Sequence, residues 1–213
     1  MIAPSAAIYN RWVLSFYDFF VLVFSNYTVW QCPTSLIREL YNKNISNNHL
    51  DIGVGTGYFL DKCNFPYIEP KITLIDLNPN CLQIAAKRIA RYRPKTYIAD
   101  IFDRLPLTNE RFDSASLNYL LHCLPGNFSN KAIVFKNINP YLNPGATVFG
   151  STILGKKSKS FLAKQLIKLY NAKGIMGNEQ DTREDLETVL SQNFDSYSVW
   201  EVGSVAFFVG KKV

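Results

Sequence analysis

A short apolar segment that ends in alternating glycines constrains this chain more than any other feature. His49 to Gly53 reads as a buried strand, and Gly55 and Gly57 continue the glycine spacing up to the start of an amphipathic stretch. Glycines at every second position let a ligand approach the backbone, and the first turn of a helix supplies free N–H donors. The pattern therefore predicts a strand, a turn and a helix that bind a nucleotide-sized ligand.

The rest of the chain repeats this alternation of short apolar runs and longer amphipathic stretches. We expect strands at His49 to Gly53, Ile72 to Asp76, Thr96 to Asp100, Phe112 to Asn118, Ala146 to Thr152, Tyr197 to Val202 and Ser204 to Val209. We expect helices at Gly57 to Cys63, Asn80 to Tyr92, Asn130 to Leu142, Ser158 to Ala172 and Thr182 to Gln192. The order predicts an α/β fold with a seven-stranded, mostly parallel sheet, helices on both faces and an antiparallel C-terminal hairpin.

The length of 213 residues suits one domain that covers 1–213. Within it we expect a helical cap at 1–45, a core at 46–213 and a substrate-side helical segment at 155–195. The cap contains Trp12 to Trp30, which is rich in aromatic residues and has one charge, at Asp18. Polar residues interrupt this segment, so we expect no membrane span. An aromatic cap helix and a weakly membrane-seeking helix are the two interpretations that stay open.

Charge and cysteine content narrow the classes of partner and compartment. The net charge of +6 is scattered, and its densest stretch, from Lys156 to Lys168, falls on one expected helix and the turn before it. A solvated helix face explains that stretch better than a nucleic-acid or membrane footprint. The four cysteines form no C-x-x-C pair and have no histidine at zinc-ligand spacing, so we expect no metal site and free thiols in the cytoplasm.

The spacing of the glycines selects the kind of nucleotide. A dinucleotide fingerprint needs its third glycine at position 58, where this chain has Tyr58, and this excludes a nicotinamide-dependent reductase. Asp51 stands two residues before Gly53, and Asp76 ends the second strand nineteen residues after Gly57. The two oxygens of the Asp76 carboxylate suit the two hydroxyls of a ribose.

The sequence from His49 to Tyr58 resembles the first motif of class I S-adenosylmethionine-dependent methyltransferases. Two further segments, Tyr119 to Gly126 and Tyr170 to Ile175, are similar to sequences found in short bacterial and fungal members of the methyltransferase type 12, ubiquinone-biosynthesis-like group. The resemblance implies a Rossmann-like core. It also implies S-adenosylmethionine as the cofactor and S-adenosylhomocysteine as the product.

The resemblance also implies roles for individual residues along the expected sheet edge. Asp51 and the glycines lie beside the amino-acid part of the cofactor, and Asp100 and Ile101 contact the adenine. A turn-capping role for Asp100 is the alternative. Asn118 and Tyr119 lie beside the sulfonium. The expected cofactor-binding residues are Tyr17, Trp30, Asp51, Gly53, Gly55, Thr56, Gly57, Asp76, Leu77, Asp100, Ile101 and Asn118.

Methyl transfer to a hydroxyl or an amine needs an in-line approach of the acceptor, and a general base is optional. His122 and Tyr119 are the candidate catalytic residues. His122 follows a ligand-facing strand end and is the natural base. The alternative is that its ring turns inward to a backbone partner. His49 starts the first strand, at the far end of the sheet, and is expected to be structural.

The acceptor class follows by elimination. Amino-methylating enzymes for nucleic-acid bases carry Asn/Asp-Pro-Pro-Tyr/Phe where this chain has Asn118-Tyr119-Leu120-Leu121. We expect methylation of an O or N atom of a small apolar or aromatic molecule, held against the cap, with Tyr17 and Trp30 closing the cofactor pocket. Alternatively the cap aromatics only pack against the sheet.

Two other functions stay open at this point. A cofactor-binding but inactive partner subunit would use the apolar Trp12 to Trp30 segment as its interface. An RNA methyltransferase would bind its substrate in a strongly salt-dependent way. We expect no specific nucleic-acid partner, and the sequence leaves a homodimer open.

Overall fold

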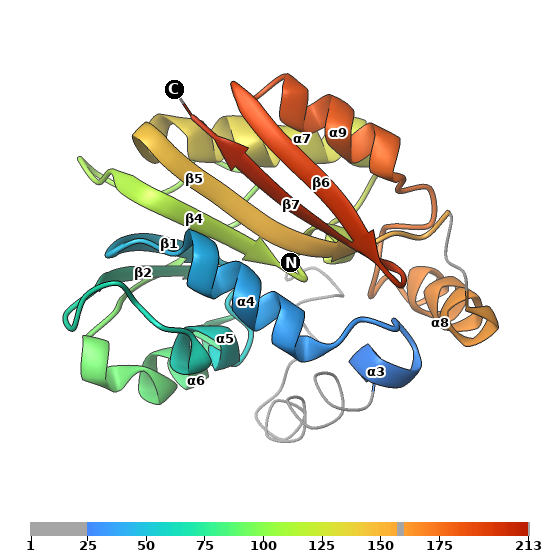
Figure 1. The fold of residues 1–213 in the computed structure, drawn as a ribbon, viewed down its shortest axis with the longest axis horizontal. Coiled ribbons are helices and arrows are strands. Elements are labelled where there is room, and N and C mark those ends of the chain that lie inside the picture. The colour runs from blue at the N-terminus through green and yellow to red at the C-terminus, as the bar shows by residue number, and fades with distance from the viewer. Residues whose placement is uncertain (1–24, 157–159, 213) are drawn as a thin grey trace.

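The computed structural model describes residues 25–156 and 160–212, and these form one seven-stranded sheet with helices on both faces (Figure 1). The strand order is β3-β2-β1-β4-β5-β7-β6. The strands are β1 (Asn48–Ile52), β2 (Lys71–Asp76), β3 (Lys95–Ile98), β4 (Phe112–Asn118), β5 (Leu142–Ile153), β6 (Ser196–Val202) and β7 (Val205–Lys211). β1 to β5 pair in parallel, and β7 runs antiparallel to both β5 and β6. The predicted fold class and C-terminal hairpin are therefore confirmed.

The helices divide between the two faces of the sheet. They are α3 (Asn26–Thr28), α4 (Thr34–Asn44), α5 (Tyr58–Lys62), α6 (Pro79–Arg88), α7 (Phe128–Ile138), α8 (Phe161–Ala172) and α9 (Arg183–Ser191). α4, α5 and α6 cover one face, and α7 and α9 lie side by side on the other (Figure 1). This is the layering that right-handed crossovers between parallel strands produce.

Each face of the sheet has its own apolar core. Phe135 of α7 and Phe208 of β7 are fully buried on one face, and Ile37 of α4 and Phe149 of β5 are fully buried on the other. Because helices cover both faces, the central strands β1 and β4 are buried at all but one residue each. Polar side chains that do occur on these strands therefore need a specific partner.

Several boundaries differ by a few residues from those predicted, and the helix expected up to Leu142 ends at Ile138. β3 ends at Ile98, so Asp100 lies in the following loop. The helix predicted up to Tyr92 stops at Arg88 and is followed by a short 3-10 turn, Ala90–Tyr92. β5 begins at Leu142, earlier than predicted, because the chain passes through Gly145 at φ +80° and shifts register against β4 without leaving the sheet.

None of the helices in the described residues is long and apolar enough to span a membrane. The predicted aromatic segment from Trp12 lies mostly outside the described residues, so the structure gives its position only from Ser25 onward. From there α3 and α4 lead directly into β1.

Candidate functional site

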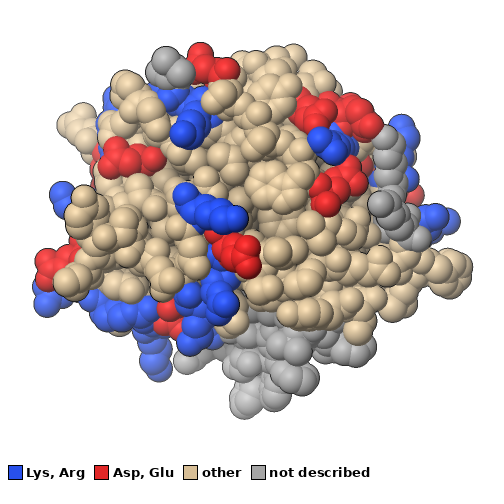
Figure 2. Space-filling model, in the orientation of Figure 1, with Lys and Arg blue, Asp and Glu red and all other residues tan. Residues whose placement is uncertain are grey.

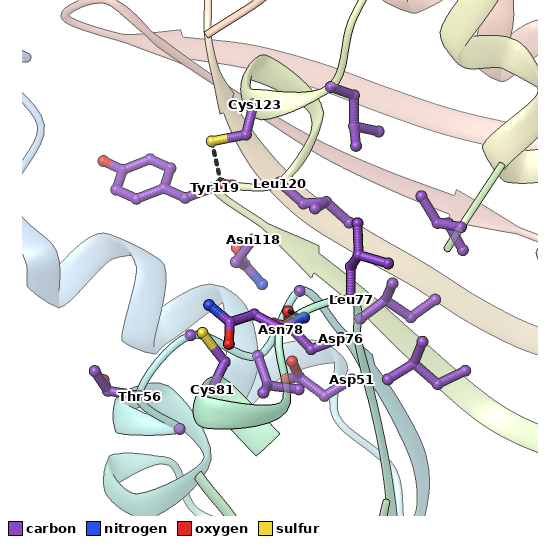
Figure 3. Close-up of a pocket in the computed structure, with 18 of the residues that line it drawn as sticks. Asp51, Thr56, Asp76, Leu77, Asn78, Cys81, Asn118, Tyr119, Leu120 and Cys123 are labelled. Carbon is purple, nitrogen blue, oxygen red and sulfur yellow. Dashed lines mark hydrogen bonds between the residues drawn. The ribbon is translucent and has the colours of Figure 1, made fainter. Parts of the chain in front are cut away.

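A cavity opens at the carboxyl ends of β1, β2 and β4, where an open sheet of this kind binds its ligands (Figure 3). The loops after these strands and the start of α5 form much of its wall. Most of the predicted site residues line it: Asp51, Gly53, Gly55, Thr56, Gly57, Asp76, Leu77, Asp100, Ile101, Asn118 and Tyr119. The fold thus brings together residues that are as far apart in the sequence as Asp51 and Tyr119.

The glycine turn between β1 and α5 serves two purposes. Gly53 and Gly57 have φ angles of +71°, and a Cβ on them would lie 2.8 Å from Leu120 Cδ1 and 3.0 Å from Ala85, respectively. A Cβ on Gly55, where φ is +52°, would meet no protein atom within 4 Å. Gly53 and Gly57 are therefore required for packing, and Gly55 is the position at which bare backbone leaves room for a ligand.

Asp76 ends β2 with its carboxylate held at the edge of the cavity. Its Oδ1 accepts a hydrogen bond of 2.8 Å from the backbone N–H of Asn78, and Gly55 and Val54 also offer it backbone N–H groups. Burial nevertheless raises the pKa of Asp76 to about 6. A buried carboxylate fixed by backbone donors is a suitable acceptor for ligand hydroxyls.

Asp100 combines the two roles that the sequence left open. Its Oδ1 accepts the backbone N–H of Phe102 at 2.9 Å, which caps the turn after β3, and its side chain also lines the cavity. Ile101 is buried beside it, and its carbonyl accepts a hydrogen bond from Asn137. Apolar Ile101 and Phe102 next to a carboxylate form a wall that suits a flat heterocycle.

Asn118 and Tyr119 close the end of the cavity nearest β4. Figure 3 shows the Asn118 side chain directed toward Asn78 and Asp76, at the end of β2. Its Oδ1 accepts from Ser151 Oγ at 3.0 Å, whereas its buried Nδ2 has no hydrogen-bond partner in the described part of the chain. Tyr119 has a left-handed φ of +54°, and its hydroxyl donates to Asn26 Oδ1 at 2.9 Å. Backbone strain of this kind at a cavity wall is typical of functional sites.

Tyr41 of α4 is a wall residue that sequence reasoning missed. Its hydroxyl donates to Asp51 Oδ2 at 2.8 Å, and Ser116 Oγ donates to the same oxygen at 2.7 Å. Burial, together with the neighbouring Asp51 charge, raises the pKa of Tyr41 well above its ordinary value. Tyr41 is therefore a donor at any ordinary pH. No motif could have found it, because α4 precedes the recognisable sequence.

The structure does not bring His122 to the cavity wall. Its ring is 4% exposed, and its Nδ1 accepts the backbone N–H of Ile153 at 3.3 Å. Burial, assisted by the positive charge of Lys131, lowers the pKa of His122 to about 3. The inward orientation that we considered as the alternative is thus the one observed. A neutral, enclosed imidazole of low basicity is poorly suited to act as a general base.

Trp30 also lies away from the cavity wall, contrary to our expectation. Its side chain is 3% exposed in the core beneath α4, and its carbonyl accepts the N–H of Ser204 at 2.9 Å. Gly203 allows this contact, since a Cβ there would lie 2.1 Å from the Trp30 carbonyl oxygen. Trp30 therefore attaches the N-terminal segment to the hairpin β6–β7. Tyr17 lies outside the described residues.

Comparison with known proteins agrees with this geometry. A family model described as a methyltransferase domain matches residues 50–148. Demethylluteothin O-methyltransferase from Streptomyces thioluteus is 36% identical, with 94% of this chain and 87% of that protein covered. A physcion biosynthesis cluster O-methyltransferase from Aspergillus chevalieri is 40% identical, with 97% and 94% covered.

Solved structures show the same fold at lower sequence identity. The structure titled "DhpI-SAH complex structure" aligns with a TM-score of 0.67 and 18% identity over 98% of this chain and 95% of that one. The N-methyltransferase NodS from Bradyrhizobium japonicum aligns with a TM-score of 0.59 and 17% identity over 84% of each chain.

The chain belongs to the family of class I S-adenosylmethionine-dependent methyltransferases. Its cofactor is S-adenosylmethionine, and it is a methyltransferase enzyme. The cavity fits this cofactor on its own evidence. Gly55 leaves open space at a backbone turn, the buried Asn118 Nδ2 has no hydrogen-bond partner among the described residues, and three carboxylates lie at the cavity wall.

Proposed function

We propose that this enzyme methylates a hydroxyl oxygen of a small, neutral, apolar or aromatic molecule. The observation that carries the proposal is the charge of the cavity wall. Among the described wall residues the charged side chains are Asp51, Asp76 and Asp100, and there is no Lys, Arg or His. A phosphorylated or carboxylated acceptor would meet no basic side chain of this wall that could pair with its charge. The names of the related O-methyltransferases support oxygen as the acceptor atom.

We assign each predicted site residue of the cavity wall to one part of the cofactor. Asp51 faces the amino-acid end, Asp76 the ribose, and Asp100 with Ile101 the adenine. Asn118 and Tyr119 lie at the reacting end, and Gly53, Gly55, Thr56, Gly57 and Leu77 shape the remaining contacts. The bound cofactor supplies an electrophilic methyl group on a sulfonium. The contribution of this chain is to orient cofactor and acceptor and to keep water out.

The lack of a histidine at the cavity narrows the acceptor further. The chain has two histidines, His49 and His122, and neither lines the cavity in the described structure. Without an imidazole base, an acceptor hydroxyl that ionises readily is favoured. Phenols and enols do so far more easily than aliphatic alcohols, which favours an aromatic or enolic acceptor.

An acceptor panel tests this proposal. The enzyme is incubated with S-adenosylmethionine and one acceptor: a substituted phenol, an enolic pyrone, an aliphatic alcohol, an amine, or a phenol that carries a phosphate group beside its free hydroxyl. The release of S-adenosylhomocysteine is then measured. We expect turnover with members of the first two classes. Turnover restricted to alcohols, amines or phosphorylated compounds would overturn it.

The two alternative functions, an RNA methyltransferase and an inactive partner subunit, predict different experimental results. On the face that Figure 2 shows, basic side chains gather at the lower left with a few acidic ones among them, and both signs are scattered elsewhere. An RNA methyltransferase would bind its substrate with an affinity that falls steeply with salt. An inactive partner subunit would bind S-adenosylhomocysteine but methylate none of the acceptors. We keep Tyr17 as a proposed contact of the cofactor pocket.

We also propose a reducing, cytoplasmic compartment for this enzyme. Cys32, Cys63, Cys81 and Cys123 are all free thiols. Burial raises the pKa of the Cys32 and Cys63 thiols to about 12, so these groups are unreactive. A homodimer remains a proposal that sedimentation of the purified protein would test.

A further inference from the structure

Polar side chains form a continuous line across a buried face of the central strands. β1 and β4 pair in a register that sets His49 opposite Ser114 and Asp51 opposite Ser116. Since side chains alternate along a strand, all four residues share one face. Each is 3% exposed or less. Polar groups buried to this degree are costly unless they bond to one another, so their pattern of hydrogen bonds is informative.

The bonds to Asp51 converge on one of its two oxygens. Ser116 Oγ donates to Oδ2 at 2.7 Å and the Tyr41 hydroxyl donates to Oδ2 at 2.8 Å. Oδ1 receives neither of these bonds, and the Asp51 side chain lines the cavity. Two donors on one oxygen fix the rotation of the carboxylate and leave Oδ1 as the atom available to a ligand.

His49 extends this arrangement by a hydrogen bond to Ser116. Ser116 has one hydroxyl hydrogen, which it donates to Asp51, so its oxygen accepts from His49 Nε2 at 3.0 Å. On the other side of the ring, Nδ1 lies 2.7 Å from Ser114 Oγ. The ring also stacks on Phe149, with 5.7 Å between centroids. The titratable side chains that face it are Asp51, whose Oδ2 lies 3.7 Å from Nε2, and Tyr41.

We propose that His49 is a positioning residue that acts through Ser116 to orient the Asp51 carboxylate toward the amino-acid end of the cofactor. The inference rests on the cofactor placement proposed above. Our sequence expectation for His49 was purely structural, because it starts its strand far from the cavity. The Ser116 hydroxyl bonds to both His49 and Asp51. A change at His49 is therefore expected to alter ligand affinity through Asp51.

Two ligands separate positioning from general stability. S-adenosylhomocysteine carries the amino-acid end, and 5′-methylthioadenosine has the same nucleoside without it. Their dissociation constants are measured by calorimetry for the wild type, His49→Phe and Ser116→Ala. His49→Phe keeps the stacking on Phe149 and removes the Nε2 donor. Ser114→Ala is the matched control, because it removes a bond to the opposite ring nitrogen.

We expect His49→Phe and Ser116→Ala to weaken S-adenosylhomocysteine binding about tenfold, the effect of one hydrogen bond to a charged group. Methylthioadenosine binding should change less than about twofold, as should both ligands in Ser114→Ala. His49→Gln, whose amide nitrogen reaches the Nε2 position, should restore most of the affinity. Equal weakening of both ligands, or no weakening of either, would overturn the proposal.

Failure of the cofactor placement gives a different result, because Asp51→Asn itself would then weaken S-adenosylhomocysteine and methylthioadenosine equally or weaken neither. If His49→Phe does not fold, nitrogen NMR of the wild-type protein still shows which ring nitrogen of His49 carries the hydrogen. With two histidines in the chain, the two spectra are assigned by one variant at His122. A hydrogen on His49 Nε2 is expected, and an unprotonated Nε2 would contradict the arrangement.

Discussion

Asp51 and Asp181 are both buried carboxylates in this enzyme, but their surroundings give them different roles. Asp51 has donors on one oxygen and lines a cavity. Asp181, before α9, pairs with Lys131 of α7 at 2.5 Å, and both side chains are 0% exposed. Lys131 also donates to the carbonyl of Gly177 at 2.9 Å. The Asp181 pair is enclosed and binds a loop to a helix, whereas Asp51 keeps an oxygen for a ligand.

The comparison teaches that burial alone does not identify a functional carboxylate. Desolvation raises the pKa of Asp181 to about 6 and lowers the pKa of Lys131, and it also raises that of Asp76 to about 6. The same shift thus occurs in an enclosed ion pair and in a cavity wall. What separates them is whether an oxygen meets open space.

The largest effect is expected from breaking the enclosed pair. Lys131→Met leaves Asp181 as a buried, uncompensated group, and the free energy of unfolding should fall by about 3–5 kcal/mol in urea titrations. The double variant Lys131→Met/Asp181→Leu should recover most of this loss. A loss below about 1 kcal/mol in the single variant would show that the pair contributes little.

Asp51→Asn should have a large effect on ligand binding and a small effect on stability, whereas Lys131→Met mainly lowers stability. Loss of the charge should weaken S-adenosylhomocysteine binding by about 2 kcal/mol, since bonds to charged groups have this strength. Asparagine keeps an acceptor oxygen for Tyr41 and Ser116, so the unfolding free energy should change by about 1 kcal/mol or less. Calorimetry and urea unfolding measure the two quantities. Equal losses of binding free energy and of unfolding free energy would contradict the ligand-binding role of Asp51.

Affinity for the cofactor product should depend on pH through Asp76. Its pKa of about 6 means that the carboxylate is ionised at pH 7 and becomes protonated as the pH falls through 6. Protonation weakens it as an acceptor for ribose hydroxyls, so affinity should be roughly tenfold lower at pH 5 than at pH 8. Asp76→Asn should bind weakly at both pH values. A wild-type affinity that rises on acidification would contradict the assignment.

The smallest effect is expected at His122. A general base typically contributes 10²–10⁴ in rate, whereas an enclosed neutral imidazole contributes nothing of this kind. His122→Asn, whose Oδ1 is able to accept the Ile153 N–H, should retain kcat within about threefold. A hundredfold fall in kcat, with the fold intact by circular dichroism, would return His122 to the catalytic residues.

Local sequence was sufficient to predict the parts of the site that follow strands. Gly53, Gly55, Asp76 and Asn118 could be placed because parallel strands end at one edge of the sheet, and a strand is recognised from its own residues. Their roles toward the cofactor remain predictions until binding is measured.

Contacts between distant segments could not be predicted in this way. Tyr41 reaches Asp51 because α4 packs on β1, and His49 reaches it because of the register of β1 against β4. Trp30 is buried in the core, and its backbone contacts the turn at Gly203. Such contacts depend on packing and register, which no spacing rule records.

Titration of the purified enzyme with S-adenosylhomocysteine by calorimetry, beside Asp76→Ala and with NADH as the control ligand, tests the central claim most directly. The account predicts micromolar binding to the wild type, loss of at least about tenfold in Asp76→Ala, and no binding of NADH. Absence of binding to the wild type, or equal binding to Asp76→Ala, would contradict the assignment of this cavity to the cofactor.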